Sequence, residues 1–514
     1  MTNVAAVRYD VVARSAKPTM SNATDPDPSP PSSTREGEEA PSSAPRTISI
    51  LWAMVPILTL VGTLATVILI LPAYEPGFEG TGHLPLIISG AVAALIARAH
   101  GWRWPEIQGG VLRAIHLAMG AVLILIVIGM LMGTWLISGI VPALIDWGLM
   151  LLRPSYFLPA SCAVCSIVSV VSGSSWSTAG TIGLALIGVG DVMGVPSPYT
   201  AGAVISGAYF GDKLSPMSDT TNLAPAMAGT DLFTHVRHML WTTVPSWVIS
   251  MTIYTFMGLN LEVQPMGGSV DEIHALIQAQ FSPSWVHLLV PGITAVLVLR
   301  KMPALPVLLL ATVLGGALAV FQGQPLGTTL TTTMSGFAPD TGNASVDELL
   351  ARGGMMSMTS TILLILSAMF FGGVMECTGM LRTLALKILS LAQSTGSLIA
   401  STVFTSIGFN ILAGDQYIAV VVPGRMYGPE YEARGLHPKN LSRALEDGGT
   451  ITSPLIPWNT CGAYMSTTLG VATLAYLPFC FLNIINPIIS IIYGYTGFSI
   501  APKDPETSSG TPPT

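Results

Sequence analysis

Residues 206–228 read SGAYFGDKLSPMSDTTNLAPAMA, a stretch that places two aspartates, a lysine and several hydroxyl side chains between long apolar segments. Ionisable groups are costly near hydrocarbon, so they usually face a cavity, pair with one another and mark an ion or substrate path. Pro216 and Pro225 interrupt the helix here, and non-helical backbone at membrane depth is tolerated only where it lines a cavity or is buried in protein. This stretch therefore predicts a transport site inside a membrane protein.

The composition of the chain is that of a multi-pass membrane protein. Only 10% of its 514 residues are charged, against roughly 25% in soluble domains, and 52 glycines with 38 prolines are typical of membrane helices. The expected partner is the lipid bilayer, and no basic run indicates nucleic acid. No HExxH or P-loop sequence supports zinc proteolysis or ATP hydrolysis. The sequence thus predicts a transporter that is not an enzyme, has no cofactor and draws its energy from an ion gradient.

Five parts are predicted along the chain. The first residues are rich in Ser, Pro, Thr and Glu and bury too little apolar surface to fold. Loops with Lys and Arg alternate with loops that have almost none, and this asymmetry places the N-terminus in the cytoplasm. The parts are a disordered cytoplasmic tail (1–48), a first transmembrane repeat (49–260), an external loop (261–284), a second transmembrane repeat (285–495) and a disordered C-terminal tail (496–514), all in a protein of the plasma membrane.

Each half carries unusual residues in the same order, namely a Gly-rich break in an apolar segment, then an Asp, a Ser-Pro and an Asn. The breaks are residues 172–180 and 408–416, followed by Asp212, Ser215, Pro216 and Asn222 in the first half and by Asp447, Ser453, Pro454 and Asn459 in the second. Broken helices at corresponding places of two halves are typical of transporters with inverted repeats. The predicted fold is an all-α polytopic membrane protein with two inverted-topology repeats and discontinuous helices.

The polar side chains of these segments suit a sodium ion. Na+ is a hard cation that takes oxygen ligands, and the Ser-Pro breaks add free backbone carbonyls. A carboxylate that holds Na+ when ionised and releases it when protonated makes the two ions compete for one place. The predicted sodium ligands are Asp212, Asp219, Asn222 and Asn459. Further residues predicted to bind the ion or a substrate are Ser174, Ser175, Thr178, Ser215, Thr220, Asn410, Asp415, Asp447, Ser453 and Thr460.

Several of these residues also have structural interpretations. Asp212 is able to pair with Lys213 as a loop salt bridge, and Asp219 is able to cap a helix. The hydroxyl groups of residues 172–180 are of a kind that often bonds back to its own helix in membranes. Glu446 and Asp447 follow a basic loop, and there they are either solvated helix-end charges or part of a cavity wall.

Four motifs resemble those of one known family. GDKLSPMSDTTNLAPA (211–226) closely resembles the signature of the NhaC-type sodium/proton antiporters, within the wider ion-transporter superfamily. SGSSWSTAGTIG (172–183), GFNILAGDQYIAVVVPGRMY (408–427) and LEDGGTITSPLIPWNTCGAYM (445–465) are similar to other motifs of that family. The resemblance implies exchange of Na+ for H+ by alternating access, two inverted repeats, re-entrant hairpins and often a homodimer.

The same resemblance fits a second function. A relative on this scaffold would couple Na+ and H+ to a small organic anion, such as malate or lactate, or to an amino acid. Such a carrier needs a cationic or amide group for a carboxylate, and Lys213 or the N-terminus of a half-helix would serve. The sequence leaves these two functions open.

Overall fold

The structure is a computed structural model that describes residues 46–74, 82–261, 270–300, 302–340, 342, 347 and 350–503. Within these ranges the chain folds into helices, and the one pairing of strand type is an isolated bridge between Leu436 and Pro502. The predicted all-α fold class is confirmed, while the inverted relation of the two halves stays a prediction. Residues 1–45 and 504–514 of the predicted tails, and residues 262–269 of the predicted external loop, lie outside the described residues.

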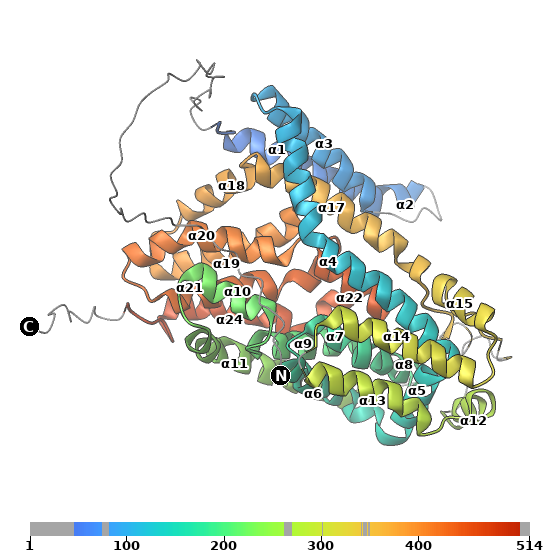
Figure 1. Ribbon diagram of the computed structural model, residues 1–514. Helices are drawn as coiled ribbons and strands as arrows, with labels where there is room; N and C mark the ends of the chain where they lie inside the picture. The colour runs from blue at the N-terminus through green and yellow to red at the C-terminus, as the bar shows by residue number, and fades with distance from the viewer. Residues whose placement is uncertain are drawn as a thin grey trace, which may run out of the picture. The chain divides into compact units, whose positions relative to one another are not determined.

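Figure 1 gives the arrangement of the helices. Up to residue 259 the elements are α1 (Ile50–Ala65), η1 (Thr66–Ile70), α2 (Leu71–Tyr74), α3 (His83–Ala99), α4 (Trp104–Ile137), α5 (Ile140–Leu151), α6 (Pro154–Ser172), α7 (Ser175–Thr178), η2 (Ala179–Gly183), α8 (Leu184–Val192), α9 (Ser197–Leu214), α10 (Asp219–Ala228) and α11 (Leu232–Leu259). From residue 270 they are α12 (Val270–Phe281), α13 (Val286–Leu299), α14 (Ala304–Phe321), α15 (Leu326–Ser335), η3 (Met355–Met358), α17 (Thr359–Cys377), α18 (Met380–Leu389), α19 (Thr395–Ala413), α20 (Gln416–Ala433), α21 (Pro438–Leu445), η4 (Glu446–Thr450), η5 (Ser453–Leu455), α22 (Thr460–Leu469), α23 (Thr473–Tyr476), η6 (Leu477–Phe479) and α24 (Phe481–Thr496).

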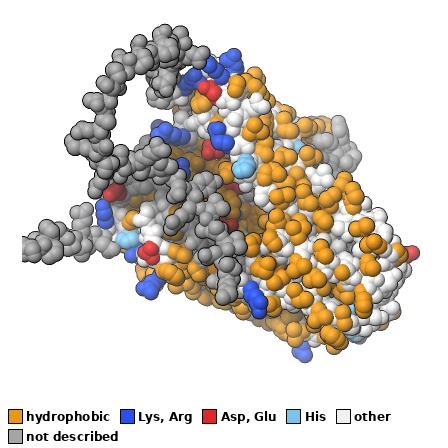
Figure 2. All heavy atoms as spheres, viewed as in Figure 1, with side chains coloured by type: hydrophobic (Ala, Val, Ile, Leu, Met, Phe, Trp, Pro, Cys, Tyr) orange, Lys and Arg blue, Asp and Glu red, His pale blue; other side chains and the backbone are white. Residues whose placement is uncertain are grey.

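The helices present an apolar surface that suits a lipid environment. Five described helices are long and apolar enough to cross a membrane, or up to seven spans if each of two bent helix pairs is counted as one. Large apolar side chains lie on the outside, and Leu95, Phe256 and Val313 are more than half exposed. Figure 2 shows such side chains covering a broad face of the molecule. An exposed apolar surface of this extent marks a membrane contact, so the chain is a multi-pass membrane protein.

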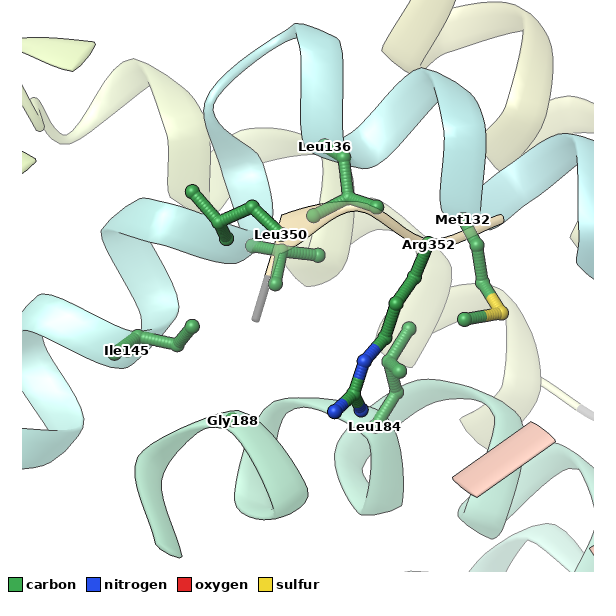
Figure 3. A pocket seen from close by; sticks show the side chains of 8 residues that line it. Met132, Leu136, Ile145, Leu184, Gly188, Leu350 and Arg352 are labelled. Atoms are coloured by element: carbon green, nitrogen blue, oxygen red, sulfur yellow. The ribbon is translucent and has the colours of Figure 1, made fainter. Parts of the chain in front are cut away.

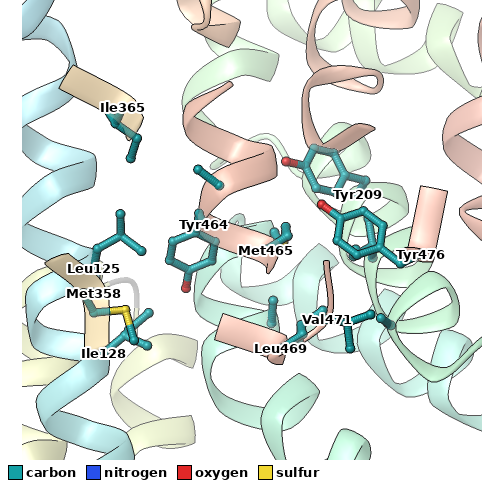
Figure 4. Close-up of a cluster of buried hydrophobic side chains, with 14 of the residues drawn as sticks. Leu125, Ile128, Tyr209, Met358, Ile365, Tyr464, Met465, Leu469, Val471 and Tyr476 are labelled. Atoms are coloured by element: carbon teal, nitrogen blue, oxygen red, sulfur yellow. The ribbon is translucent and has the colours of Figure 1, made fainter. Parts of the chain in front are cut away.

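The core joins helices from both halves of the chain. The longest helix, α4, has 34 residues and packs against α17 and α14, as Figure 1 shows. Figure 4 shows Leu125 and Ile128 of α4 near Tyr464 and Met465 of α22, with Tyr209 of α9 beyond them. These side chains are buried and belong to one hydrophobic cluster. This cluster therefore joins α22, α4 and α9 in one core.

In the first half, two interrupted helices meet at their breaks. Helix α6 ends at Gly173, whose φ of 68° is a left-handed conformation that glycine adopts without strain, and α7 follows. Helix α9 ends at Leu214 before Pro216, and α10 starts at Asp219. A Cβ atom on Gly173 would lie 2.8 Å from Cβ of Met217, so the two breaks touch.

Close packing of α6 on α9 sets the position of the acidic end of α9. The Ser169 hydroxyl of α6 donates to the Ala208 carbonyl of α9 at 2.5 Å. A Cβ atom on Gly211 would lie 2.6 Å from the Ser166 carbonyl oxygen, so only glycine fits this contact. The next residue along α9 is Asp212, which this packing holds beside the break after α6.

The second half repeats this arrangement. Helix α19 ends at Gly414, with φ of 69°, and α20 follows, while the chain between α21 and α22 runs through the short turns η4 and η5. The backbone N–H of Thr460, at the start of α22, donates to the carbonyl of Gly414 at 2.9 Å. A main-chain hydrogen bond therefore ties the two breaks of this half together.

Some residues predicted to lie in tails or loops pack on the helices. Ile48 is buried, and its carbonyl accepts a hydrogen bond of 3.2 Å from the Thr383 hydroxyl. At the other end, the backbone N–H of Ala501 donates to Oδ1 of Asn440 at 3.0 Å. Part of the predicted external loop forms helix α12, where Gln278 donates to the buried carboxylate of Asp146 at 2.8 Å. The ordered chain thus extends beyond the predicted repeat boundaries on both sides.

Candidate functional site

The breaks of both halves line one cavity of about 590 Å³. The first half contributes residues 172–177 at the start of α7 and residues 217–220 between α9 and α10. The second half contributes residues 415–417 at the start of α20 and Thr460 at the start of α22. Figure 2 shows a hollow in the molecule in which acidic atoms are visible. The segments that the sequence singled out in each half therefore converge on a common space.

Three carboxylates dominate the chemistry of this cavity. Asp212, Asp219 and Asp415 line it together with serine and threonine hydroxyls and the amide of Gln416. Among the residues that the structure describes, no Lys, Arg or His contributes to the lining. Like charges in a confined space repel each other strongly, so the cavity favours a bound cation or bound protons over its empty, fully ionised state.

Asp212 and Asp219 occupy different surroundings. Asp212 lies in the last turn of α9, is buried, and accepts a hydrogen bond of 2.7 Å from the Ser175 hydroxyl of α7. Asp219 is the first residue of α10 and is solvent-exposed where it lines the cavity. An acidic residue in the first turn of a helix is stabilised by the helix dipole. Asp219 therefore supports α10 and faces the cavity at the same time.

Asp415 combines a structural contact with a place in the cavity wall. Its Oδ1 accepts hydrogen bonds from the backbone N–H groups of Tyr417 at 2.9 Å and Ile418 at 3.2 Å, which caps α20. Its Oδ2 accepts a hydrogen bond of 3.3 Å from the Thr460 hydroxyl. The carboxylate thus joins the starts of α20 and α22 and presents negative charge to the cavity.

Comparisons with known proteins bear on the family of this chain. A sequence model described as the Na+/H+ antiporter family matches residues 207–498, which include both breaks of the second half and the α9–α10 break. The chain belongs to the Na+/H+ antiporter family. The resemblance to NhaC-type antiporters is confirmed, and this family member is a transporter, not an enzyme.

Curated relatives of this antiporter carry several names. The Na+/H+ antiporter NhaC of Alkalihalophilus pseudofirmus is 37% identical over 81% of this chain and 91% of its own length. The arginine/ornithine antiporter ArcD of Halobacterium salinarum is 36% identical over 83% of this chain and 89% of its own. The malate-2H+/Na+-lactate antiporter of Bacillus subtilis is 35% identical over 80% of this chain and 89% of its own length.

The structure brings half of the predicted site residues of this antiporter into the cavity. The predicted residues that line it are Ser174, Ser175, Asp212, Asp219, Thr220, Asp415 and Thr460. Those that do not line it are Thr178, Ser215, Asn222, Asn410, Asp447, Ser453 and Asn459. Two of the four predicted sodium ligands, Asn222 and Asn459, therefore lie outside the cavity wall.

The excluded residues of the first half hold its breaks in shape. The Asn222 side-chain amide donates to the carbonyls of Pro216 at 2.9 Å and Ser218 at 2.7 Å, which stabilises the turn before α10. The Thr178 hydroxyl bonds back to the Ser174 carbonyl at 2.9 Å. Ser215 is buried, and its hydroxyl lies 3.4 Å from the backbone N–H of Met217.

The excluded residues of the second half form a buried amide network. Asn410 donates to the Gly449 carbonyl at 2.5 Å and to the Thr452 hydroxyl at 3.0 Å, and its own side-chain oxygen accepts from Asn459 at 3.1 Å. Asn459 caps α22 by accepting from the Cys461 N–H at 3.0 Å. Ser453 donates to the Thr450 carbonyl at 2.7 Å. These contacts satisfy the backbone groups that broken helices leave free.

We expect Asn410→Ala to lower the free energy of unfolding by about 1–3 kcal/mol, because the buried Gly449 carbonyl would lose its side-chain donor. Thermal unfolding of the purified protein in detergent measures the change. Asn260→Ala is the matched control, since Asn260 is exposed at the end of α11. Loss of transport at an unchanged unfolding temperature would instead assign Asn410 to the ion path.

Asp447 lies in a buried ion pair rather than in the cavity. Its Oδ1 pairs with Nζ of Lys213, and neither side chain is exposed. Lys213 also donates to Oδ1 of Asn486 at 2.6 Å, and Thr242 donates to Asp447 at 3.1 Å. The alternative interpretation in which Lys213 pairs with Asp212 is therefore wrong. The solvated interpretation of Glu446 and Asp447 is also wrong, since both are fully buried.

The cavity also contains residues that were not predicted to bind the ion or a substrate. Gln416 and Tyr417 follow Asp415 directly and line the same wall. Trp176 lines the cavity and stacks on Tyr464, with ring centroids 4.0 Å apart, and the Tyr464 hydroxyl donates to the Trp176 carbonyl at 2.7 Å. Their position beside predicted residues is the signal that would have found them.

A second pocket is too small for a substrate. Figure 3 shows Arg352 beside Met132, Leu136 and Leu184. The Arg352 guanidinium lies 3.3 Å from the carboxylate of Asp191. The space of about 20 Å³ has room for about one water molecule. A third pocket, of about 570 Å³, is lined in part by Arg113, His116 and Glu376 and contains none of the predicted site residues. The cavity around Asp212 is therefore the candidate transport site.

Proposed function

We propose that this protein exchanges Na+ for H+ across the plasma membrane by alternating access to the cavity around Asp212, with its N-terminus in the cytoplasm. The observation that carries the proposal is the cavity lining of three carboxylates and several hydroxyls without a basic residue among the described lining residues. The family match and the Na+/H+ antiporter NhaC of Alkalihalophilus pseudofirmus support the same pair of ions.

Asp212, Asp219 and Asp415 are the groups proposed to alternate between Na+ and H+. When ionised, a carboxylate supplies the oxygen ligands that a hard cation prefers, and protonation removes the charge that holds the ion. Mutual repulsion of the three charges favours occupation of the cavity by one ion or the other. Exchange follows if the cavity changes its exposure from one side of the membrane to the other only when it is occupied.

The size of the cavity favours a second candidate function, which is the exchange of a cationic amino acid. Its volume of about 590 Å³ exceeds the need of one sodium ion and falls in the range of about 300–1,000 Å³ usual for small-molecule sites. Carboxylates bind ammonium and guanidinium groups, whereas they repel an organic anion. Lys213, expected to bind an organic carboxylate, is held by Asp447 outside the cavity wall. The lining thus favours a cationic amino acid over malate or lactate.

Purified protein in liposomes with a trapped pH indicator tests both functions. We expect an external pulse of NaCl, but not of choline chloride, to drive protons out and make the lumen alkaline. Arginine, ornithine, malate and lactate, added one at a time without Na+, are expected to leave the lumenal pH unchanged. A sodium pulse without a pH response, together with uptake of radioactive arginine into liposomes loaded with ornithine, would reject the leading function in favour of the second.

A further inference from the structure

A buried group of charged side chains lies next to the cavity but does not line it. We call it the Glu446 cluster, and it consists of Lys213 at the end of α9, Glu446 and Asp447 in η4, Arg443 at the end of α21 and His235 in α11. All five side chains are buried. Burying charged groups inside a membrane protein costs free energy, and such groups usually have a function. This cluster therefore needs an explanation.

Most members of the Glu446 cluster have a partner. Lys213 is held by Asp447 and Asn486. Arg443 donates to the Ser499 hydroxyl at 2.5 Å, and Nδ1 of His235 lies 2.8 Å from the Ser442 hydroxyl. The charge of Lys213 is therefore already balanced by Asp447, whereas Nε and Nη2 of Arg443 have no hydrogen-bond partner among the described residues.

Glu446 is the exception. Its side chain is fully buried, and neither carboxyl oxygen has a hydrogen-bond partner in the described part of the chain. The Thr450 hydroxyl, four residues on, is near enough to interact with the carboxyl group but makes no hydrogen bond of normal geometry to it. An ionised carboxylate without a donor would lose its hydration and gain nothing in return. A neutral, protonated carboxyl group avoids this cost.

We propose that Glu446 is a proton-binding residue of the transport cycle, separate from the carboxylates of the cavity. The proposal rests on the proposed function, because it assigns one of the exchanged protons to Glu446. The reaction is the simple dissociation of a carboxyl group: Glu446 binds a proton in the state described here and releases it when its surroundings change.

The position of Glu446 relative to Asp212 couples proton binding at Glu446 to sodium binding at Asp212. Asp212 is a wall residue of the cavity and the chain neighbour of Lys213, which pairs with Asp447, the chain neighbour of Glu446. A sodium ion bound at Asp212 adds positive charge near Glu446 and so favours release of its proton. By linkage, the proton on Glu446 disfavours sodium at Asp212, which is the sign that exchange requires.

Other ionisable groups lie on the elements that pack around η4. Helix α19, which packs against η4, has no ionisable residue. The remaining groups are Asp219 on α10, Arg443 and Lys439 on α21, Tyr417, Arg425, Tyr427, Glu430, Tyr431 and Glu432 on α20, Tyr493 and Tyr495 on α24, and His235, Arg237, His238 and Tyr254 on the nearby α11. Of these, Glu430 pairs with Arg434, and Glu432 with Lys503, at the molecular surface. They do not supply a donor to Glu446.

The test compares Glu446→Gln with Glu432→Gln, whose parent residue is exposed and paired with Lys503. In infrared spectra of the purified protein, we expect the wild type to have a carbonyl band of a buried protonated carboxyl group. This band should be absent from Glu446→Gln and present in Glu432→Gln. In liposomes, uptake of radioactive sodium driven by a pH gradient should fall to the background in Glu446→Gln, while exchange of sodium for sodium at equal pH should continue.

Three results would overturn the proposal. They are an unchanged carbonyl band in Glu446→Gln, pH-driven sodium uptake at the wild-type rate in that variant, or loss of sodium–sodium exchange that Glu446→Asp does not restore, which would assign Glu446 a structural role. Failure of the wild type to move sodium at all would reject the proposed function instead. In that case the infrared comparison alone still decides whether Glu446 holds a proton.

Discussion

Replacing Asp212 with asparagine is expected to abolish sodium-dependent proton movement. The asparagine side chain has nearly the same shape and its oxygen still accepts the hydrogen bond from Ser175, so the α7–α9 contact is retained. It carries no charge to hold Na+ and takes up no proton near neutral pH. Proton release from liposomes after a sodium pulse, measured as for the wild type, should fall to the rate of protein-free liposomes.

The control for this variant is Asp340→Asn, which removes one carboxylate from an exposed position outside the cavity. Its flux should equal that of the wild type. Equal yields and elution profiles in detergent establish that both variants fold. Sodium-dependent flux at the wild-type rate in Asp212→Asn would remove Asp212 from the mechanism and leave Asp219 and Asp415 as the shared carboxylates.

The Lys213→Met variant is expected to lose most of its stability. Lys213 and Asp447 form an ion pair in which neither side chain is exposed. Removing the lysine leaves a buried carboxylate without its counter-charge, and breaking a buried pair in this way costs about 3–5 kcal/mol. Thermal unfolding of the purified protein, followed by intrinsic fluorescence in detergent, should show a large drop in the midpoint temperature.

A second substitution distinguishes the ion pair from the other contacts of Lys213. Lys213→Met combined with Asp447→Asn removes both charges and should recover most of the lost stability, because the asparagine still accepts the hydrogen bond from Thr242. If the double variant is no more stable than Lys213→Met, the loss arises from the contact of Lys213 with Asn486. An unchanged midpoint in Lys213→Met would show that the pair contributes nothing to stability.

The sequence predicted the helical class and the place of the cavity well, for a physical reason. Pro216 and Gly414 lie where the helices beside Asp212 and Asp415 end, whereas Pro225 lies inside α10 and the interruption predicted there is wrong. Polar side chains inside apolar segments must face a cavity or each other. Both signals are local in sequence. They therefore identified the four segments that converge, including Ser174 and Ser175 on one side and Thr460 on the other.

The role of each side chain within those segments was not predictable in the same way. Asn222 and Asp219 lie three residues apart in one motif, yet the cavity includes Asp219, while Asn222 turns back onto the carbonyls of Pro216 and Ser218. Lys213 pairs with a residue 234 positions away rather than with its chain neighbour. Such choices depend on the packing of α9 against η4 and α24, which composition and spacing do not encode.

The hydrogen bond from the Thr460 N–H to the Gly414 carbonyl has a bearing on evolution. Because it joins the two interrupted helices through main-chain atoms alone, substitution of the neighbouring side chains does not remove it. Natural selection is thus free to vary the wall of the cavity while the frame stays intact.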